Sequence, residues 1–155
     1  MTSAALLANL PGWINQSKVF CGGSNYAAPT LAWLQGTFYD FFRARLWSDS
    51  LQAWVVKWEC RDFARAYACY AQECNALTPS TPGGADILTV GEVWFIPDAD
   101  RYGVNAGQLA GTPSGGGHAI NLALVETGWV FLDPQVNLLW QMTEAELKSI
   151  YFLRF

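Results

Sequence analysis

The sequence predicts an α+β fold, in which a group of helices is followed along the chain by an antiparallel sheet. Two patterns predict it. In the first half apolar residues recur every three or four positions, as they do on one face of a helix. In the second half short runs rich in β-branched and aromatic residues replace that pattern, which is typical of strands. With 155 residues, 52% hydrophobic and 14% charged, the chain is expected to form one globular domain over residues 1–155.

Helices are expected at three places in the first half. Residues 2–10 form a short helix, and residues 30–47 form a longer one in which Gly36 is a weak point. The stretch 59–77 carries the clearest helical pattern, because its apolar side chains fall at spacings of mostly three and four. The segment 48–58 fits either a short helix or a strand.

The second half predicts strands and one final helix. Thr143 and Glu146 have the spacing of a capping box, so a helix is expected over 143–150. The stretch from Asp98 to Gly117 is too long for a plain connection and is expected to be a functional loop. The expected strands cover residues 87–97, 119–125, 129–133 and 151–155.

Charge and composition exclude some classes of partner. Nine basic residues against 13 acidic ones give a net charge of −4, which argues against a nucleic-acid partner. No apolar run reaches the roughly 18 residues of a membrane span, and no signal-peptide pattern is visible, so a soluble, cytoplasmic protein is expected. The four cysteines match no zinc spacing and are expected to be free thiols. The eight tryptophans fit core and groove walls, or else an exposed binding surface.

A nucleophile and a base can be placed on these elements. Cys60 opens the helix over 59–77, where the positive end of the helix dipole favours a thiolate. His118, the single histidine, follows three glycines and opens a strand, so its imidazole could serve as the base. Cys21, in the loop sequence "FCGGSN", is a rival nucleophile.

A third residue should orient the imidazole, and Asp133 and Gln135 both qualify. A two-residue turn at Thr127–Gly128 would pair Glu126 with Trp129. In that register Gln135 lies nearer to His118 than Asp133 does, unless a bulge intervenes. The spacing therefore leaves both candidates open.

The motifs "WECRDFA" and "GGGHAINLALVETGWVFLDPQ" resemble the papain-like cysteine peptidase superfamily. The likeness is strongest to the C-terminal peptidase domain of a mushroom agglutinin and its bacterial and phage relatives, and more distant to transglutaminase-like proteins. It covers roughly residues 37–155. It implies a papain-like α+β fold with the nucleophile helix packed on the sheet. It also implies catalytic roles for Cys60 as nucleophile, His118 as base and Asp133 as orienting acid, with Gln135 at the Gln that follows the Pro.

The resemblance implies a thiol hydrolase, a peptidase or amidase with a Cys-His-Asp triad, acting on a peptide or amide substrate. The relatives bind calcium beside the nucleophile. Here Arg61 fills the first of the two acidic positions and leaves only Asp62, so no cofactor or metal is expected. The alternative is a non-catalytic module that keeps the fold and uses its Trp-rich surface for binding or assembly. Neither Gln52 nor Trp54 can be assigned to an oxyanion hole.

Overall fold

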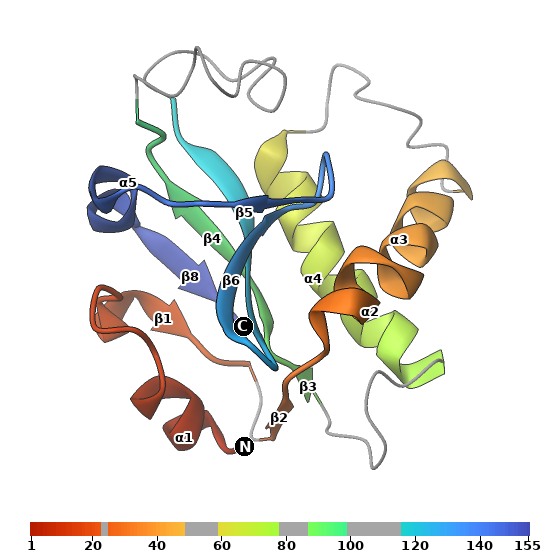
Figure 1. Cartoon of the computed structure of the whole chain (residues 1–155), viewed down its shortest axis with the longest axis horizontal. Helices are drawn as coiled ribbons and strands as arrows, with labels where there is room; N and C mark the ends of the chain where they lie inside the picture. The colour runs from red at the N-terminus through yellow and green to blue at the C-terminus, as the bar shows by residue number, and fades with distance from the viewer. Residues whose placement is uncertain (23–24, 49–58, 78–86, 99–115) are drawn as a thin grey trace.

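A mostly antiparallel sheet forms the centre of the protein. The computed structural model describes residues 1–22, 25–48, 59–77, 87–98 and 116–155 (Figure 1). Within these residues the sheet has six strands in the order β1-β8-β4-β5-β6-β7. Only the edge pair β1 and β8 is parallel. The strands are β1 (Val19–Phe20), β4 (Val90–Phe95), β5 (His118–Val125), β6 (Gly128–Asp133), β7 (Leu138–Trp140) and β8 (Phe152–Arg154).

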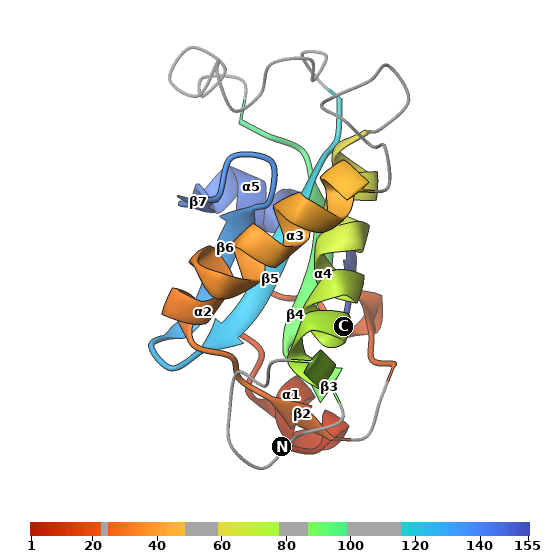
Figure 2. The ribbon, with the colours of Figure 1, turned by 90° about the vertical axis from the view of Figure 1, so that its right-hand side faces the viewer.

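Within the described residues, a group of helices from the first half of the chain covers one face of this sheet, as Figure 2 shows. Tyr67 stands at the centre of the core beneath them, fully buried, with edge-on contacts to the rings of Phe38 and Phe42 at 4.6 and 5.1 Å. Its hydroxyl donates to the Leu34 carbonyl at 3.1 Å, so no polar atom of the ring is left unpaired. The helices are α2 (Leu31–Gln35), α3 (Thr37–Ser48) and α4 (Cys60–Leu77).

The opposite face is covered by chain ends. A second apolar cluster joins Val93, Ile120 and Leu153 of the sheet to Leu10 and Ile150. These two come from segments next to α1 (Ser3–Ala8) and α5 (Glu144–Ser149). The remaining elements are the 3-10 helix η1 (Gln16–Lys18) and a small parallel pair, β2 (Tyr26–Ala27) and β3 (Ile87–Leu88).

The expected α+β class is confirmed, as is the capping box that opens α5. The expected helix over 30–47 is two helices instead, because Gly36 adopts φ −110° and ψ −103°, outside the helical region. Strands β1, β2 and β7 were missed because each is too short to show alternation. The segment 49–58, with Gln52 and Trp54, and the stretch 99–115 of the expected functional loop lie outside the described residues.

In the part of the chain that the structure describes, no helix is both long and apolar enough to cross a membrane.

Candidate functional site

Cys60 and His118 stand at the starts of two elements that are tied together. The Asn121 amide on β5 donates to the carbonyl of Ala64 on α4 at 2.8 Å and to that of Gly91 on β4 at 3.0 Å. Ala64 lies one turn after Cys60, so this buried amide holds the first turns of α4 against the two strands. The helix start itself is capped, since Asp62 accepts from the Glu59 N–H at 3.0 Å.

The imidazole of His118 is enclosed on nearly all sides. Its side chain is fully buried, and its Nε2 lies 3.4 Å from Oδ2 of the equally buried Asp133. The ring also contacts those of Phe95 and Trp140, with centroids 5.8 and 5.5 Å away. Among the described residues Nδ1 has no nitrogen or oxygen partner. The ring nitrogen opposite the carboxylate is therefore the one available to the Cys60 thiol.

Asp133 reaches His118 because of the β5–β6 register. The hairpin pairs Val125 with Gly128 and Leu122 with Phe131. The expected register, with Glu126 opposite Trp129, was therefore wrong by two positions. The turn falls one residue earlier than expected, so Asp133 falls opposite Ile120 instead of Leu122, two positions nearer to His118 along β5. This brings the carboxylate within reach of the ring without a bulge.

Gln135 lies beyond the end of β6, in the turn that follows. Its backbone N–H donates to Oδ1 of Asp133 at 2.9 Å. This is an Asx-type turn, in which the carboxylate bonds to the backbone two residues on. Among the contacts of the described residues, Gln135 thus meets the site through its main chain and helps to fix Asp133.

The cysteine and the histidine stabilise each other's charged forms. Burial alone raises the pKa of the Cys60 thiol, but the hydrogen bond and charge of His118 and the N–H groups of Ala119 and Arg61 lower it below its ordinary value. Burial alone lowers the pKa of His118, but hydrogen bonds and charge from Asp133 and Cys60 raise it to about 9. The arrangement therefore shifts both groups toward their charged forms, a thiolate facing an imidazolium.

The other cysteines lack this environment. Burial raises the pKa of the Cys21 thiol, and a hydrogen bond to Tyr26 offsets it only in part. Cys74 lies in the core, where burial and the charge of Glu73 both raise its pKa. All four cysteines lie in the described part of the chain and are free. Cys21 is thus the weaker candidate for a nucleophile.

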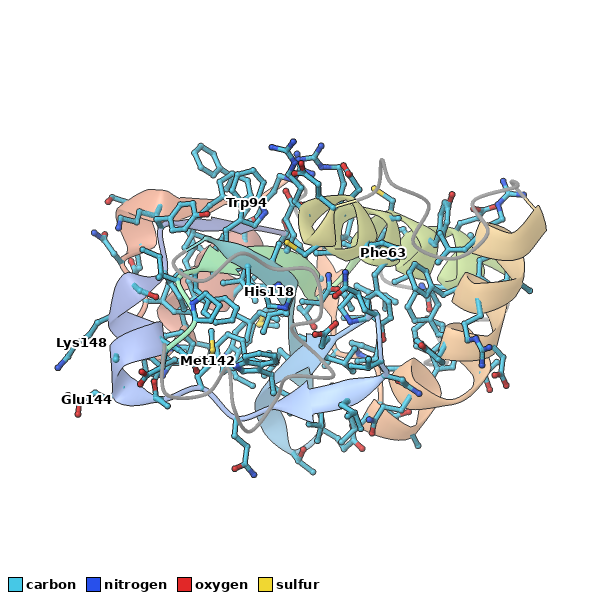
Figure 3. The ribbon with its side chains drawn as sticks, turned by 90° about the horizontal axis from the view of Figure 1, so that it is seen from above. Phe63, Trp94, His118, Met142, Glu144 and Lys148 are labelled. Atoms are coloured by element: carbon cyan, nitrogen blue, oxygen red, sulfur yellow. The ribbon has the colours of Figure 1, made fainter. Side chains whose placement is uncertain are left out.

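A pocket of about 200 Å³ opens beside the thiol. Its aromatic wall is made by Trp94 of β4 and by Tyr151, just before β8; sequence reasoning singled out neither. Figure 3 shows Trp94 at the rim of the molecule and His118 further in. Burial and the charge of Cys60 raise the pKa of Tyr151, which places its hydroxyl in the field of the thiolate. The described lining residues are Glu59, Cys60, Arg61, Trp94, Gly117, His118, Ala119 and Tyr151.

Gly117, the last of the three glycines before His118, also lines the pocket. A side chain at Gly117 would collide with the Tyr151 hydroxyl, so the glycine before His118 is what lets that ring approach. Tyr151 and Trp94 come from segments far apart in sequence, which only the tertiary fold brings together.

The described residues do not include a metal-binding cluster of three or more His, Cys, Asp and Glu side chains. Arg61 is paired with Glu59 at 3.0 Å, and Asp62 caps the helix. Asp62, the one acidic residue left at the two positions that the family resemblance linked to calcium, thus serves as a helix cap.

The comparisons with known proteins establish a shared fold. No family model matches the chain, and no curated protein matches it by sequence. Two solved structures cover the whole chain. One is described as a PSL1a–E64 complex, with a TM-score of 0.64 and 16% identity over 50% of its own length. The other is the Polyporus squamosus lectin bound to a human-type influenza-binding epitope, with a TM-score of 0.62 and 15% identity over 49%. The chain thus spans about half of each neighbour, and identities this low show the fold alone.

These findings correct the assignment made from the motifs. The neighbours are named as a lectin and its complexes, so the assignments to the papain-like cysteine peptidase superfamily and to thiol hydrolases, together with the peptide or amide partner, were wrong. The physical reason lies in what the motifs specify. A buried carboxylate, an imidazole and a thiol at this spacing determine how reactive the thiol is, but they determine neither the ligand nor a reaction.

Proposed function

We propose that the chain is a ligand-binding module that captures an electrophilic ligand at Cys60. One observation carries the proposal: a thiol of lowered pKa lines an open pocket and is backed by the buried His118–Asp133 pair. Neighbours of the same fold support a ligand-binding role, since their names describe complexes with E64 and with a glycan epitope.

Each residue has a defined part in the capture. The Cys60 thiolate attacks an electrophilic carbon bonded to oxygen, and a sulfur–carbon bond forms as a carbon–oxygen bond breaks. The electron pair moves to that oxygen, which takes the proton held by His118. Asp133 fixes the ring through Nε2 and stabilises its charge until that proton leaves.

Two finer statements belong to the same proposal. The papain-like form of the α+β fold is supported by the thiol at the start of α4 and the histidine at the start of β5. A cytoplasmic location is supported by the four free thiols, which suit a reducing compartment.

Site-resolved alkylation tests the proposal. The protein is treated with iodoacetamide at neutral pH, and the rate at each cysteine is followed by mass spectrometry. Cys69 is the matched internal reference, because it is exposed on the same helix. We expect Cys60 to be alkylated faster than Cys69 although it is more buried. E64, which carries an epoxide, should then modify Cys60 and leave Cys60→Ser unmodified. A Cys60 rate equal to or below that of Cys69 would overturn the proposed function.

A further inference from the structure

A row of aromatic side chains leads away from the Cys60 pocket along the sheet. Trp94 and Tyr151 line the pocket, and their ring centroids are 6.1 Å apart. Phe152 packs against Trp94 with centroids at 4.5 Å, and Phe20 stacks on Phe152 at 5.9 Å. The row passes from β4 to β8 to β1, and we call these four residues the aromatic shelf.

The sheet register places the shelf outside the core. Trp94 pairs with Phe152, and the next pair along, Val93 with Leu153, is buried in the apolar cluster. Because successive side chains of a strand point to opposite faces, Trp94 and Phe152 lie on the other face, which α4 also covers in part.

An ion cluster lies on the same face as the shelf. Glu92, two residues before Trp94, is buried and pairs with Arg65 of α4 at 3.5 Å and with Arg154 of β8 at 3.2 Å. These pairs join the helix to β8 in line with the shelf. The side chain of Phe152 thus lies between charged groups on one side and the open pocket on the other.

The shelf leaves much apolar area in contact with solvent. Phe20 is 57% exposed and Tyr151 is 46% exposed, while Trp94 and Phe152 are half-buried. A contiguous exposed apolar patch of this kind is typical of a binding surface. Its first two rings, Trp94 and Tyr151, also form the pocket wall, so the shelf is continuous with the pocket beside Cys60.

We infer that the aromatic shelf is a subsite for a flat apolar group carried by the ligand that Cys60 captures. The inference rests on the proposed function and adds the chemical class of the ligand. Rings in offset or edge-on contact attract one another beyond the area that they bury. A planar group next to the electrophilic carbon would therefore stack on Trp94 and Phe152.

Two reagents with one electrophile test the subsite. Rates at Cys60 are measured for iodoacetamide and for iodoacetanilide, its N-phenyl derivative, and each is divided by the rate with free glutathione. We expect the phenyl reagent to be favoured by about threefold to tenfold, the size of one aromatic contact. Phe152→Ala should lose this preference and keep the iodoacetamide rate. Leu138→Ala, which removes an exposed apolar side chain of β7, should keep both.

The outcomes separate the two proposals. The shelf is overturned if the two reagents have the same rate at Cys60 once each is divided by its rate with glutathione. It is also overturned if Phe152→Ala retains the preference for the phenyl reagent. Either result leaves the proposed function standing. An iodoacetamide rate at Cys60 no higher than at Cys69 overturns both. If Phe152→Ala does not fold, the variant Phe20→Ala at the exposed end of the shelf takes its place. It is measured with a biphenyl iodoacetamide, which reaches further along the shelf. The substitution must lower the preference of Cys60 for the biphenyl reagent over iodoacetamide.

Discussion

The two ends of α4 carry the same side chain in opposite environments. Cys60 at the first turn faces His118 and the N–H groups of Arg61 and Ala119, and its pKa is lowered. Cys74 in the last turns lies in the apolar core, and its pKa is raised by burial. Desolvation raises the pKa of both thiols, but only Cys60 has neighbouring groups that compensate for it. The pKa values of the two thiols therefore shift in opposite directions.

This comparison shows that α4 combines a structural half and a reactive half. The apolar stripe of Tyr67, Ala71 and Cys74 anchors the helix in the core, and that anchorage sets the position of the first turn. The thiol at that turn then owes its properties to partners on β5 and β6 rather than to the helix alone.

Removal of the imidazole should have the largest effect. In His118→Ala we expect the alkylation rate of Cys60 near neutral pH to fall by about tenfold or more, since each unit of pKa changes the thiolate fraction tenfold. The measurement is the iodoacetamide rate at each cysteine across pH. The Cys69 rate should not change, and an unaltered Cys60 profile would contradict the account.

The two residues proposed for the third position should differ. Asp133→Asn removes the charge that stabilises the imidazolium, so the Cys60 rate should fall severalfold while the fold is kept. Gln135→Ala retains the backbone N–H that Asp133 accepts, so the rate should stay within about twofold. Circular dichroism controls for folding. The reverse order of effects would show that the carboxylate does not orient the ring.

The attachment of the reactive end of α4 can be tested separately. Asn121→Ala removes the buried side-chain donor that the carbonyls of Ala64 and Gly91 share, and the loss of these two hydrogen bonds should cost about 1–3 kcal/mol in the free energy of unfolding. Urea unfolding measures it. The control is Asn9→Ala, which removes a side-chain bond at the surface and should cost about 0.5 kcal/mol or less. Equal costs for the two variants would refute a special role for the buried amide.

The smallest effect on reactivity is expected at the other end of the helix. Cys74→Ala removes one buried sulfur and should cost about 1–2 kcal/mol of stability. The Cys60 rate should be unchanged, because the groups that lower the pKa of Cys60 lie on β5 and in the first turn of α4. A Cys60 rate that falls with Cys74→Ala, without unfolding, would mean that the two ends of α4 are not independent.

The sequence predicted the parts of the fold that depend on local pattern. The stripe of α4 and the capping box of Thr143 and Glu146 are set by residues a few positions apart, and both were found as expected. Placing Cys60 at a helix start and His118 at a strand start needed no more than this.

The rest depends on contacts between distant segments. The hairpin register differed by two positions, because one residue in the turn decides which side chain of β6 reaches His118. The pocket wall joins Trp94 to Tyr151 across two strands, and nothing near either residue signals that contact. The ligand class was misjudged, because the Cys60, His118 and Asp133 motifs describe the chemistry of a thiol and not what it binds.

The mutual stabilisation of a Cys60 thiolate and a His118 imidazolium is the central claim, and His118 can be observed directly because the chain has no other histidine. Its ring protons are followed by NMR as pH rises. Asp133 and Cys60 both favour the charged ring, so the imidazolium should persist through neutral pH and lose its proton at about 9. In Cys60→Ser and in Asp133→Asn the midpoint should fall, since each variant removes one negative partner. A wild-type midpoint at or below the ordinary value of 6.5, unchanged in both variants, would contradict the account.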